Sequence, residues 1–159
     1  MKPNCFAKWL KAVIIGTTLI GIGCCVYVIP EAMVMFRAEY PEFSYWILPW
    51  KLLIYGCSIP CFAAMVISWK IAENIQNDHS FCRENARLFR LFSHLALGDS
   101  IVFLVGCVLY LILGMNHPGL MILELLAVFA GLAVFVCTSA LSYLVSQAAD
   151  LQEDSDLTI

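Results

Sequence analysis

Four long apolar runs, almost free of charge, constrain the fold of this chain more than any other feature. Each run is long enough to cross a bilayer as a helix, because a hydrocarbon core of about 30 Å requires roughly 20 apolar residues. Within hydrocarbon, backbone polar groups must be satisfied inside the protein. We therefore predict an all-α membrane protein, a four-helix transmembrane bundle with spans at about residues 12–29, 52–69, 91–115 and 120–145.

The composition agrees with one membrane domain. The chain has 159 residues, of which 62% are hydrophobic and 13% are charged. Soluble domains average about 45–50% apolar and 25% charged residues. Because the four runs occupy more than half of the length, we predict a single integral membrane domain over residues 1–159, in which residues 150–159 form an acidic cytoplasmic tail.

The basic residues are distributed unevenly between the segments that flank the runs. Two of them, Arg37 and Lys51, lie between the first two runs. The N-terminal segment and the loop after the second run together carry seven: Lys2, Lys8, Lys11, Lys70, Arg83, Arg87 and Arg90. Since cytoplasmic segments carry the excess of Lys and Arg, we predict a protein of the cell membrane with both termini in the cytoplasm.

The first run and the loop after it allow alternatives. Two lysines before an apolar stretch are typical of a secretory signal, but the stretch continues to Ile29, which favours an uncleaved span that ends at Pro30. Residues 31–50 are aromatic and interrupted by prolines, and they predict a short interfacial helix in the first outer loop. An aromatic belt is favoured there over a platform for a ligand or peptide.

No motif for catalysis or cofactor binding occurs in the sequence. Six of the eight cysteines lie inside apolar runs, where a free thiol packs as a small hydrophobe. A disulfide or thiol metal site between the first two helices is the less favoured alternative. The histidines lack ligand spacing, and there is no glycine-rich phosphate loop or nucleophile elbow. We expect a protein that is not an enzyme and has no metal site and no cofactor.

Two acidic residues, Asp99 and Glu124, lie inside apolar runs, and such residues are functional candidates by default. Their positions place them roughly 11 Å apart along the bilayer normal, at 1.5 Å per residue, which argues against a carboxylate pair. We expect Asp99 to be protonated or hydrogen-bonded, and Glu124 to lie within reach of a side chain at the rim. The expected partners are Thr17, Thr18 or Ser142 for Asp99, and Lys51 or His117 for Glu124.

The loop after the second run predicts a cytoplasmic hairpin, with Ser80 as the N-cap of the next helix. Its arginines, Arg83, Arg87 and Arg90, share one helix face. They are expected to pair with acids of the tail: Asp150, Glu153, Asp154 and Asp156. Exposed ion pairs are worth only about 0–1 kcal/mol each, so this clamp would open easily. Contact of the arginines with anionic lipid headgroups is the plainer alternative.

The same two segments carry a resemblance. Ser80-Phe-Cys-Arg-Glu-Asn-Ala-Arg-Leu88 and the ending Asp156-Leu-Thr-Ile159 resemble segments of the DUF2975 family, bacterial four-span membrane proteins of unknown function. Members of that family are often encoded beside a small helix-turn-helix protein. The resemblance therefore implies a membrane-bound partner of a transcription regulator. Its candidate docking surface is Phe81–Arg90 together with Asp150–Ile159, where Leu157 and Ile159 offer apolar anchors in an acidic setting.

Together these observations predict a non-enzymatic, regulatory membrane protein. Its cytoplasmic hairpin and acidic tail would bind a soluble DNA-binding regulator, while the protein itself sits in the lipid bilayer and binds no nucleic acid directly. One alternative is a small transporter or ion-coupled module that uses Asp99. Another is an accessory subunit of a larger membrane complex. The sequence leaves the oligomeric state open.

Overall fold

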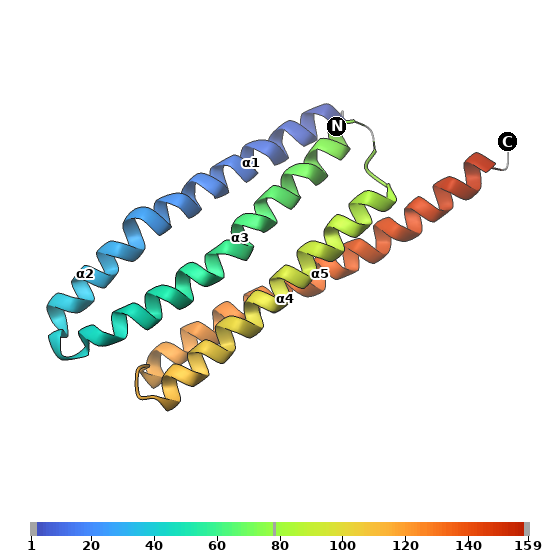
Figure 1. The fold of residues 1–159 in the computed structure, drawn as a ribbon. Helices are drawn as coiled ribbons and strands as arrows, with labels where there is room; N and C mark the ends of the chain where they lie inside the picture. The colour runs from blue at the N-terminus through green and yellow to red at the C-terminus, as the bar shows by residue number, and fades with distance from the viewer. Residues whose placement is uncertain (1–2, 78, 158–159) are drawn as a thin grey trace.

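The computed structural model describes the backbone of residues 3–77 and 79–157 and the side chains of residues 6–77 and 79–153. Helices make up almost all of this part, and it contains no strand (Figure 1). Two short elements, the π-helix η1 and the 3₁₀-helix η2, connect longer helices. The order is α1 (Pro3–Gly23), η1 (Cys24–Val28), α2 (Ile29–Glu39), η2 (Pro41–Trp46), α3 (Ile47–Gln76), α4 (Arg83–Ile112) and α5 (Pro118–Leu157).

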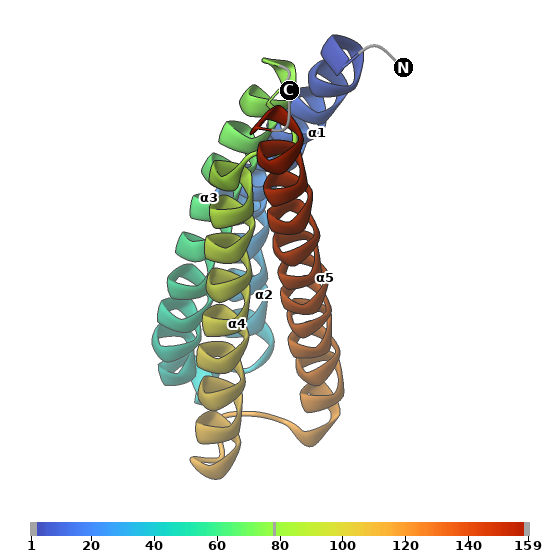
Figure 2. The same ribbon diagram turned by 90° about the vertical axis from the view of Figure 1, so that its right-hand side faces the viewer.

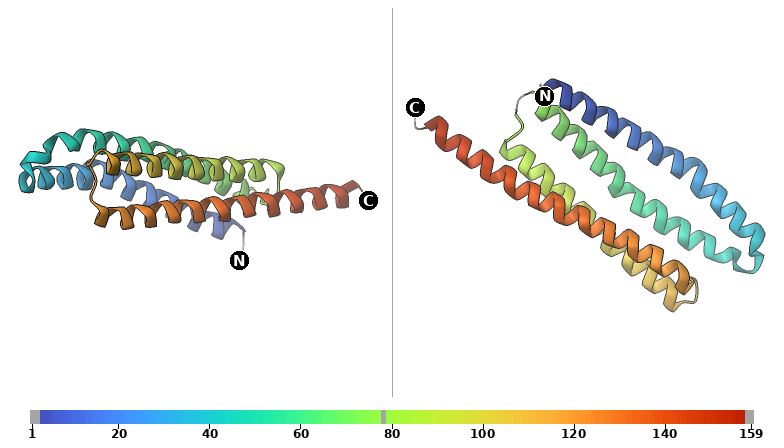
Figure 3. Two further views of the ribbon diagram at one scale, coloured as in Figure 1. Left: turned by 90° about the horizontal axis from the view of Figure 1, so that it is seen from below. Right: turned by 180° about the vertical axis from the view of Figure 1, so that it is seen from behind.

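The elements form four antiparallel rods, each long and apolar enough to cross a membrane, as the sequence predicts. Elements α1, η1 and α2 form one rod that lies beside α3, and α4 lies beside α5 (Figures 1 and 3). The two pairs are joined by packing of α3 on α4, whereas α1 and α5 make at most marginal contact. Figure 2 shows α5 beside α4, away from α3. The rods therefore form an open array with a central space rather than a tightly closed bundle.

The outer surface of the array is apolar. Large side chains such as Ile20, Ile112 and Phe129 are at least two-thirds exposed, and few residues of the described part are fully buried. Such a surface matches hydrocarbon, and packing rather than the hydrophobic effect must hold the helices together in lipid. Gly131, in the fourth run, allows close packing. A Cβ on Gly131 would collide with the Ser100 hydroxyl of α4, so α4 and α5 approach closely at this point.

The expectation that the first helix ends at Pro30 is wrong. The rod continues through Pro30 to Glu39, because the π-helical η1 changes the hydrogen-bond register just before the proline. In that register the Ile29 N–H bonds to the Cys24 carbonyl, five residues back. The next carbonyl, that of Cys25, would face the proline nitrogen, which has no hydrogen. Tyr55 of α3 supplies the missing donor, with its hydroxyl 2.7 Å from the Cys25 carbonyl oxygen.

The first outer loop agrees with the expectation of a short helix, η2, and differs in where that helix begins. Residues 29–39 extend the first rod instead of forming a separate helix, and only η2 is a short independent element (Figure 1). Aromatic packing stabilises this turn, with the rings of Phe43 and Trp46 stacked at 4.3 Å between centroids. Element α3 then begins at Ile47 and continues through Pro60 as one helix.

The hairpin between α3 and α4 is ordered around one buried residue that sequence reasoning did not single out. Asn85 is 1% exposed. Its amide nitrogen donates to the carbonyls of His79 (3.1 Å) and Ser80 (3.0 Å), and its amide oxygen accepts from Asn74 of α3 at 2.8 Å. Helix α4 begins at Arg83 with Cys82 as N-cap, so the prediction of Ser80 in that position is wrong. The Ser80 carbonyl instead accepts a hydrogen bond from the Asn85 side chain.

Packing is tightest at this hairpin end. Three alanines there, Ala7 of α1, Ala72 of α3 and Ala149 of α5, are almost fully buried, which lets the rods approach one another. The Ser142 hydroxyl of α5 donates to the Ala86 carbonyl of α4 at 2.7 Å in a buried contact. Lys11 of α1 donates to the Gln76 side chain of α3 at 2.6 Å. All four rods are thus tied together where the hairpin lies.

Candidate functional site

The first candidate site is the hairpin–tail surface, which we define as residues 81–90 of the hairpin and 150–153 of α5. Arg83 lies at its centre. The Arg83 guanidinium is 2.8 Å from a Glu153 carboxylate oxygen and 3.2 Å from one of Asp150. The two acids lie three residues apart on one face of α5, so a single arginine reaches both. The predicted pairing of the basic stripe with the tail is therefore present at Arg83.

The position of Arg83 follows from its neighbours in the chain. Two residues later, Asn85 fixes the start of α4. The hydrogen bond from Ser142 to the Ala86 carbonyl fixes the position of α5 along the axis of α4. The ion pairs themselves are open to solvent, with 57–59% of each side chain exposed. Exposed pairs of this kind contribute about 0–1 kcal/mol. The buried contacts of Asn85 and Ser142 hold the helices in place, whereas the exposed ion pairs of Arg83, which we call the clamp, are weak.

The other two arginines of this helix face differ from Arg83 in their contacts. Arg87 and Arg90 are exposed, and no ion pair involves them among the side chains that the structure describes. The predicted partner-binding residues Asp154, Asp156, Leu157 and Ile159 lie outside those described side chains. The backbone of α5 continues as helix to Leu157 and extends beyond the N-terminal end of α4 (Figures 1 and 3).

Apolar side chains accompany these charges. Phe81 is 59% exposed in the hairpin and Leu151 is 71% exposed on α5. Single exposed apolar residues are ordinary on any surface. Their position beside exposed charge of both signs makes the hairpin–tail surface suited to a partner that combines apolar and charged contacts.

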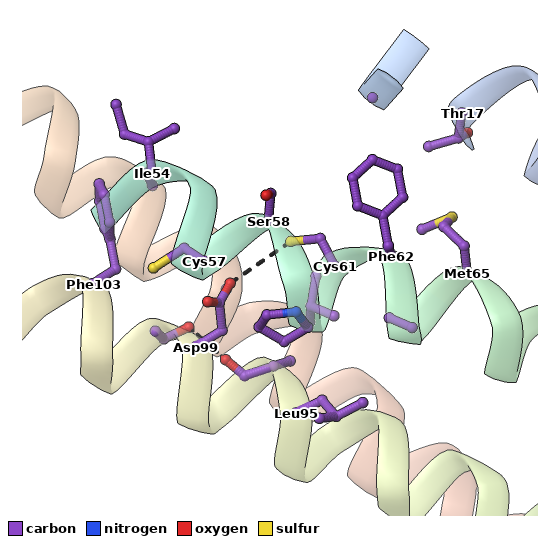
Figure 4. Close-up of a pocket in the computed structure, with 18 of the residues that line it drawn as sticks. Thr17, Ile54, Cys57, Ser58, Cys61, Phe62, Met65, Leu95, Asp99 and Phe103 are labelled. Carbon is purple, nitrogen blue, oxygen red and sulfur yellow. Dashed lines mark hydrogen bonds between the residues drawn. The ribbon is translucent and has the colours of Figure 1, made fainter. Parts of the chain in front are cut away.

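A second candidate site is the central cavity, which has a volume of about 550 Å³ and is lined by residues from α1, η1, α3, α4 and α5. Asp99 of α4 points into it toward α3 (Figure 4). One of its carboxyl oxygens accepts a hydrogen bond from the Cys61 thiol at an S···O distance of 3.7 Å. The other is buried and has no partner in the described part of the chain.

The expected partners of Asp99 are wrong. Thr18 donates to the Ile14 carbonyl of its own helix, and Ser142 donates to the Ala86 carbonyl at the hairpin end. Thr17 lines the same cavity as Asp99, but no hydrogen bond joins the two in the described structure. The thiol of Cys61 takes the place of these hydroxyl groups. The reason is geometric, because α3 lies beside α4 and carries cysteines where it passes Asp99.

Glu124 lies in a different cavity, about 490 Å³ in volume, at the opposite end from the hairpin. Its carboxylate accepts a hydrogen bond from the Asn116 side chain at 2.7 Å. Neither expected partner holds it: His117 accepts from the Gly119 N–H at 3.0 Å, and the Lys51 ammonium lies over the Tyr55 ring. Asp99 and Glu124 thus have separate surroundings, in agreement with the depth argument against a carboxylate pair.

The cysteines and histidines do not assemble a metal centre in the part of the chain that the structure describes. The seven cysteines in that part are free thiols. No group of three or more His, Cys, Asp or Glu side chains there is arranged to hold a metal ion. The alternative of a disulfide or thiol metal site between the first two helices therefore gains no support.

Two structural features were missed from the sequence. Asn85 belongs to the segment Ser80–Leu88 that carries the family resemblance, so a signal for it was present, but nothing local distinguished it from other polar hairpin residues. The pairing of Tyr55 with the Cys25 carbonyl joins two helices and had no local signal.

Comparison with known proteins gives two matches. A family model described as "Protein of unknown function (DUF2975)" matches residues 31–159. The chain is also similar to the "Uncharacterized membrane protein YoaS" of Bacillus subtilis (strain 168), with 24% identity over 150 residues, which cover 91% of this chain and 94% of the relative. No solved structure matches the chain. The family match includes the whole hairpin–tail surface and both acidic residues of the apolar runs.

Proposed function

Because the chain belongs to the DUF2975 family, whose members are described only as proteins of unknown function, we propose its function from the geometry of the hairpin–tail surface. The proposal is that this membrane protein is a non-enzymatic regulator whose hairpin–tail surface faces the cytoplasm and binds a soluble partner. A small helix-turn-helix transcription regulator is the partner that fits best.

One observation carries this proposal: Arg83 holds Asp150 and Glu153 in exposed ion pairs on a firmly packed scaffold. A partner with its own basic residues could take over the two carboxylates at little cost, because the internal pairs are weak. The acidic end of α5 is unsuited to an anionic membrane surface, which repels it. It is well suited to a basic protein surface, and DNA-binding proteins carry such surfaces.

The orientation of the protein is part of the proposal. Both described ends of the chain and the α3–α4 hairpin lie at one end of the molecule (Figure 1). The excess of basic residues lies at this same end, which supports a cytoplasmic position for it. A soluble transcription regulator would be present in that compartment.

The alternatives have less support. A transporter built on Asp99 and Glu124 would need a polar connection between them, yet the two residues line separate cavities. An accessory subunit would use its exposed apolar faces, but every membrane protein presents such faces to lipid.

The proposal can be tested with full-length protein in lipid nanodiscs and, as the probe, a purified small helix-turn-helix protein encoded beside a member of this family. Charge reversal of the tail, Asp150→Lys with Glu153→Lys, is expected to weaken binding at least tenfold, because it removes the acids that the partner would contact. Arg83→Glu is expected to strengthen binding, since it releases the same acids from their internal pairs. Interferometry measures both affinities.

Arg37→Glu provides a matched control, because it reverses a charge in α2, at the opposite end of the molecule. It should leave the affinity unchanged. Equal binding by the wild type and the tail variant would contradict the proposal, as would an absence of binding by the wild type.

A further inference from the structure

The central cavity has the dimensions and lining of a ligand site. Its volume of about 550 Å³ falls within the range of roughly 300–1,000 Å³ typical of small-molecule pockets. The lining is mostly apolar, with aromatic walls from Phe62, Phe92 and Phe103 and little bulk at Gly21 and Gly131. Ligand pockets combine such apolar walls with a few polar groups that orient the ligand.

Asp99 is the acidic residue of this lining, and no Lys, Arg or His side chain of the described chain lines the cavity with it. The cavity is therefore apolar with a single site of potential negative charge. A carboxylate at membrane depth is costly unless it has a partner. A positively charged ligand group would supply that partner.

The hydroxyl groups around the cavity do not satisfy Asp99. Thr18, Ser58 and Ser100 each donate to a backbone carbonyl in the preceding turn of their own helix, at 2.7 Å. Only the Cys61 thiol donates to Asp99 among the described residues, at 3.7 Å. A thiol is a weak donor, so this contact is easily replaced by an ammonium group. Figure 4 shows the Cys61 contact with Asp99 among the residues that line the cavity.

The side of the cavity between α1 and α5 is the route by which a ligand would enter from the membrane. Residues from α1 and from α5 both line it, yet these two rods make at most marginal contact with each other. These rods are therefore not packed closely against each other, and the outward faces of both are apolar. A ligand with an apolar body can therefore enter from the lipid.

We propose that the central cavity binds an amphiphile with a cationic amine head and an apolar body, the head paired with Asp99 and the body among the aromatic side chains. This site is independent of the hairpin–tail surface, and neither needs the other.

The test uses full-length protein in phosphatidylcholine nanodiscs and a dansyl-labelled dodecylammonium as the probe. Fluorescence polarisation is expected to show saturable binding to the wild type. Asp99→Asn preserves the shape of the side chain and removes its charge, so the affinity should fall at least tenfold. The N-acetylated form of the probe, which has no charge, should bind weakly and equally to both proteins.

Two further variants keep the outcome decisive. Glu124→Gln removes the other acid of the apolar runs, outside this cavity, and should leave the probe affinity within about twofold. Cys61→Ala removes the weak internal partner of Asp99 and should leave the affinity equal or higher. The proposal is overturned if Asp99→Asn binds the cationic probe as the wild type does. It is also overturned if the neutral probe binds as tightly as the cationic one, which would indicate a site for lipid chains, or if Cys61→Ala weakens binding as much as Asp99→Asn.

Discussion

The hairpin end and the middle of the molecule are built in opposite ways. At the hairpin end, buried alanines let the helices approach, and hydrogen bonds of Asn85 and Ser142 join one element to the next. Around Asp99, midway along the rods, a cavity lies between residues of α1, α3, α4 and α5. The comparison teaches that buried alanines and hydrogen bonds join the rods at the hairpin end, whereas in the middle the Asp99 carboxyl group faces an open space and has one weak thiol contact.

The largest loss of unfolding free energy should come from Asn85→Ala, which removes hydrogen bonds at the hairpin end. The substitution leaves the Asn74 side chain and the carbonyls of His79 and Ser80 without their partners. Each buried polar group left unsatisfied costs about 1–3 kcal/mol, so we expect a loss of roughly 3 kcal/mol or more. Thermal unfolding of the purified protein measures it.

Asn116→Ala is the matched control for that variant. Asn116 makes one side-chain hydrogen bond, to Glu124, at the end away from the hairpin. Its replacement should cost about 1 kcal/mol. Equal losses for the two variants would show that the hairpin end is no more strongly held than the opposite end.

A smaller effect is expected from Gly131→Ala, which tests the close approach of α4 and α5 beside the cavity. The new methyl group would collide with the Ser100 hydroxyl, and overpacking of this kind costs about 1–3 kcal/mol. The double variant with Ser100→Ala should recover most of the loss. Gly16→Ala is the control, since its Cβ would meet no atom within 4 Å. Failure of the double variant to recover stability would argue against the contact.

Tyr55→Phe should reduce the unfolding free energy by a still smaller amount. It tests the contact between α3 and the rod that passes through Pro30. The variant loses the hydrogen bond to the Cys25 carbonyl, and interhelical hydrogen bonds in membranes average about 0.6 kcal/mol, with a maximum of about 1.7. We expect a loss of about 1 kcal/mol, measured by unfolding in mild detergent. Tyr143→Phe, at an exposed tyrosine of α5, is the comparison and should change stability less.

The smallest effect on stability belongs to Arg83→Ala. Its ion pairs are exposed, so the unfolding free energy should change by about 0–1 kcal/mol, and by less at high salt. A loss as large as that of Asn85→Ala would show that the clamp is part of the scaffold and would remove the basis for its opening.

The sequence predicted the four helices because span length and lack of charge are local properties. It failed at Pro30 because the proline is accommodated by a π-helical register and by a hydroxyl from another helix, and neither is visible in the first run alone. The partners of Asp99 were missed for a related reason. Which helix lies beside Asp99 depends on the packing of the whole array, whereas the Arg83 pairing followed from opposite charges in two segments expected at one end.

The central claim is that the ordered hairpin end, with its weak clamp, faces the cytoplasm. Side-specific labelling with a membrane-impermeant maleimide tests it most directly, using Glu153→Cys and Arg37→Cys in a background in which Cys5 and Cys82 are replaced by serine. We predict that the label at position 153 reacts only in inside-out vesicles, and that the label at position 37 reacts in intact cells. Reaction of position 153 in intact cells would contradict the account.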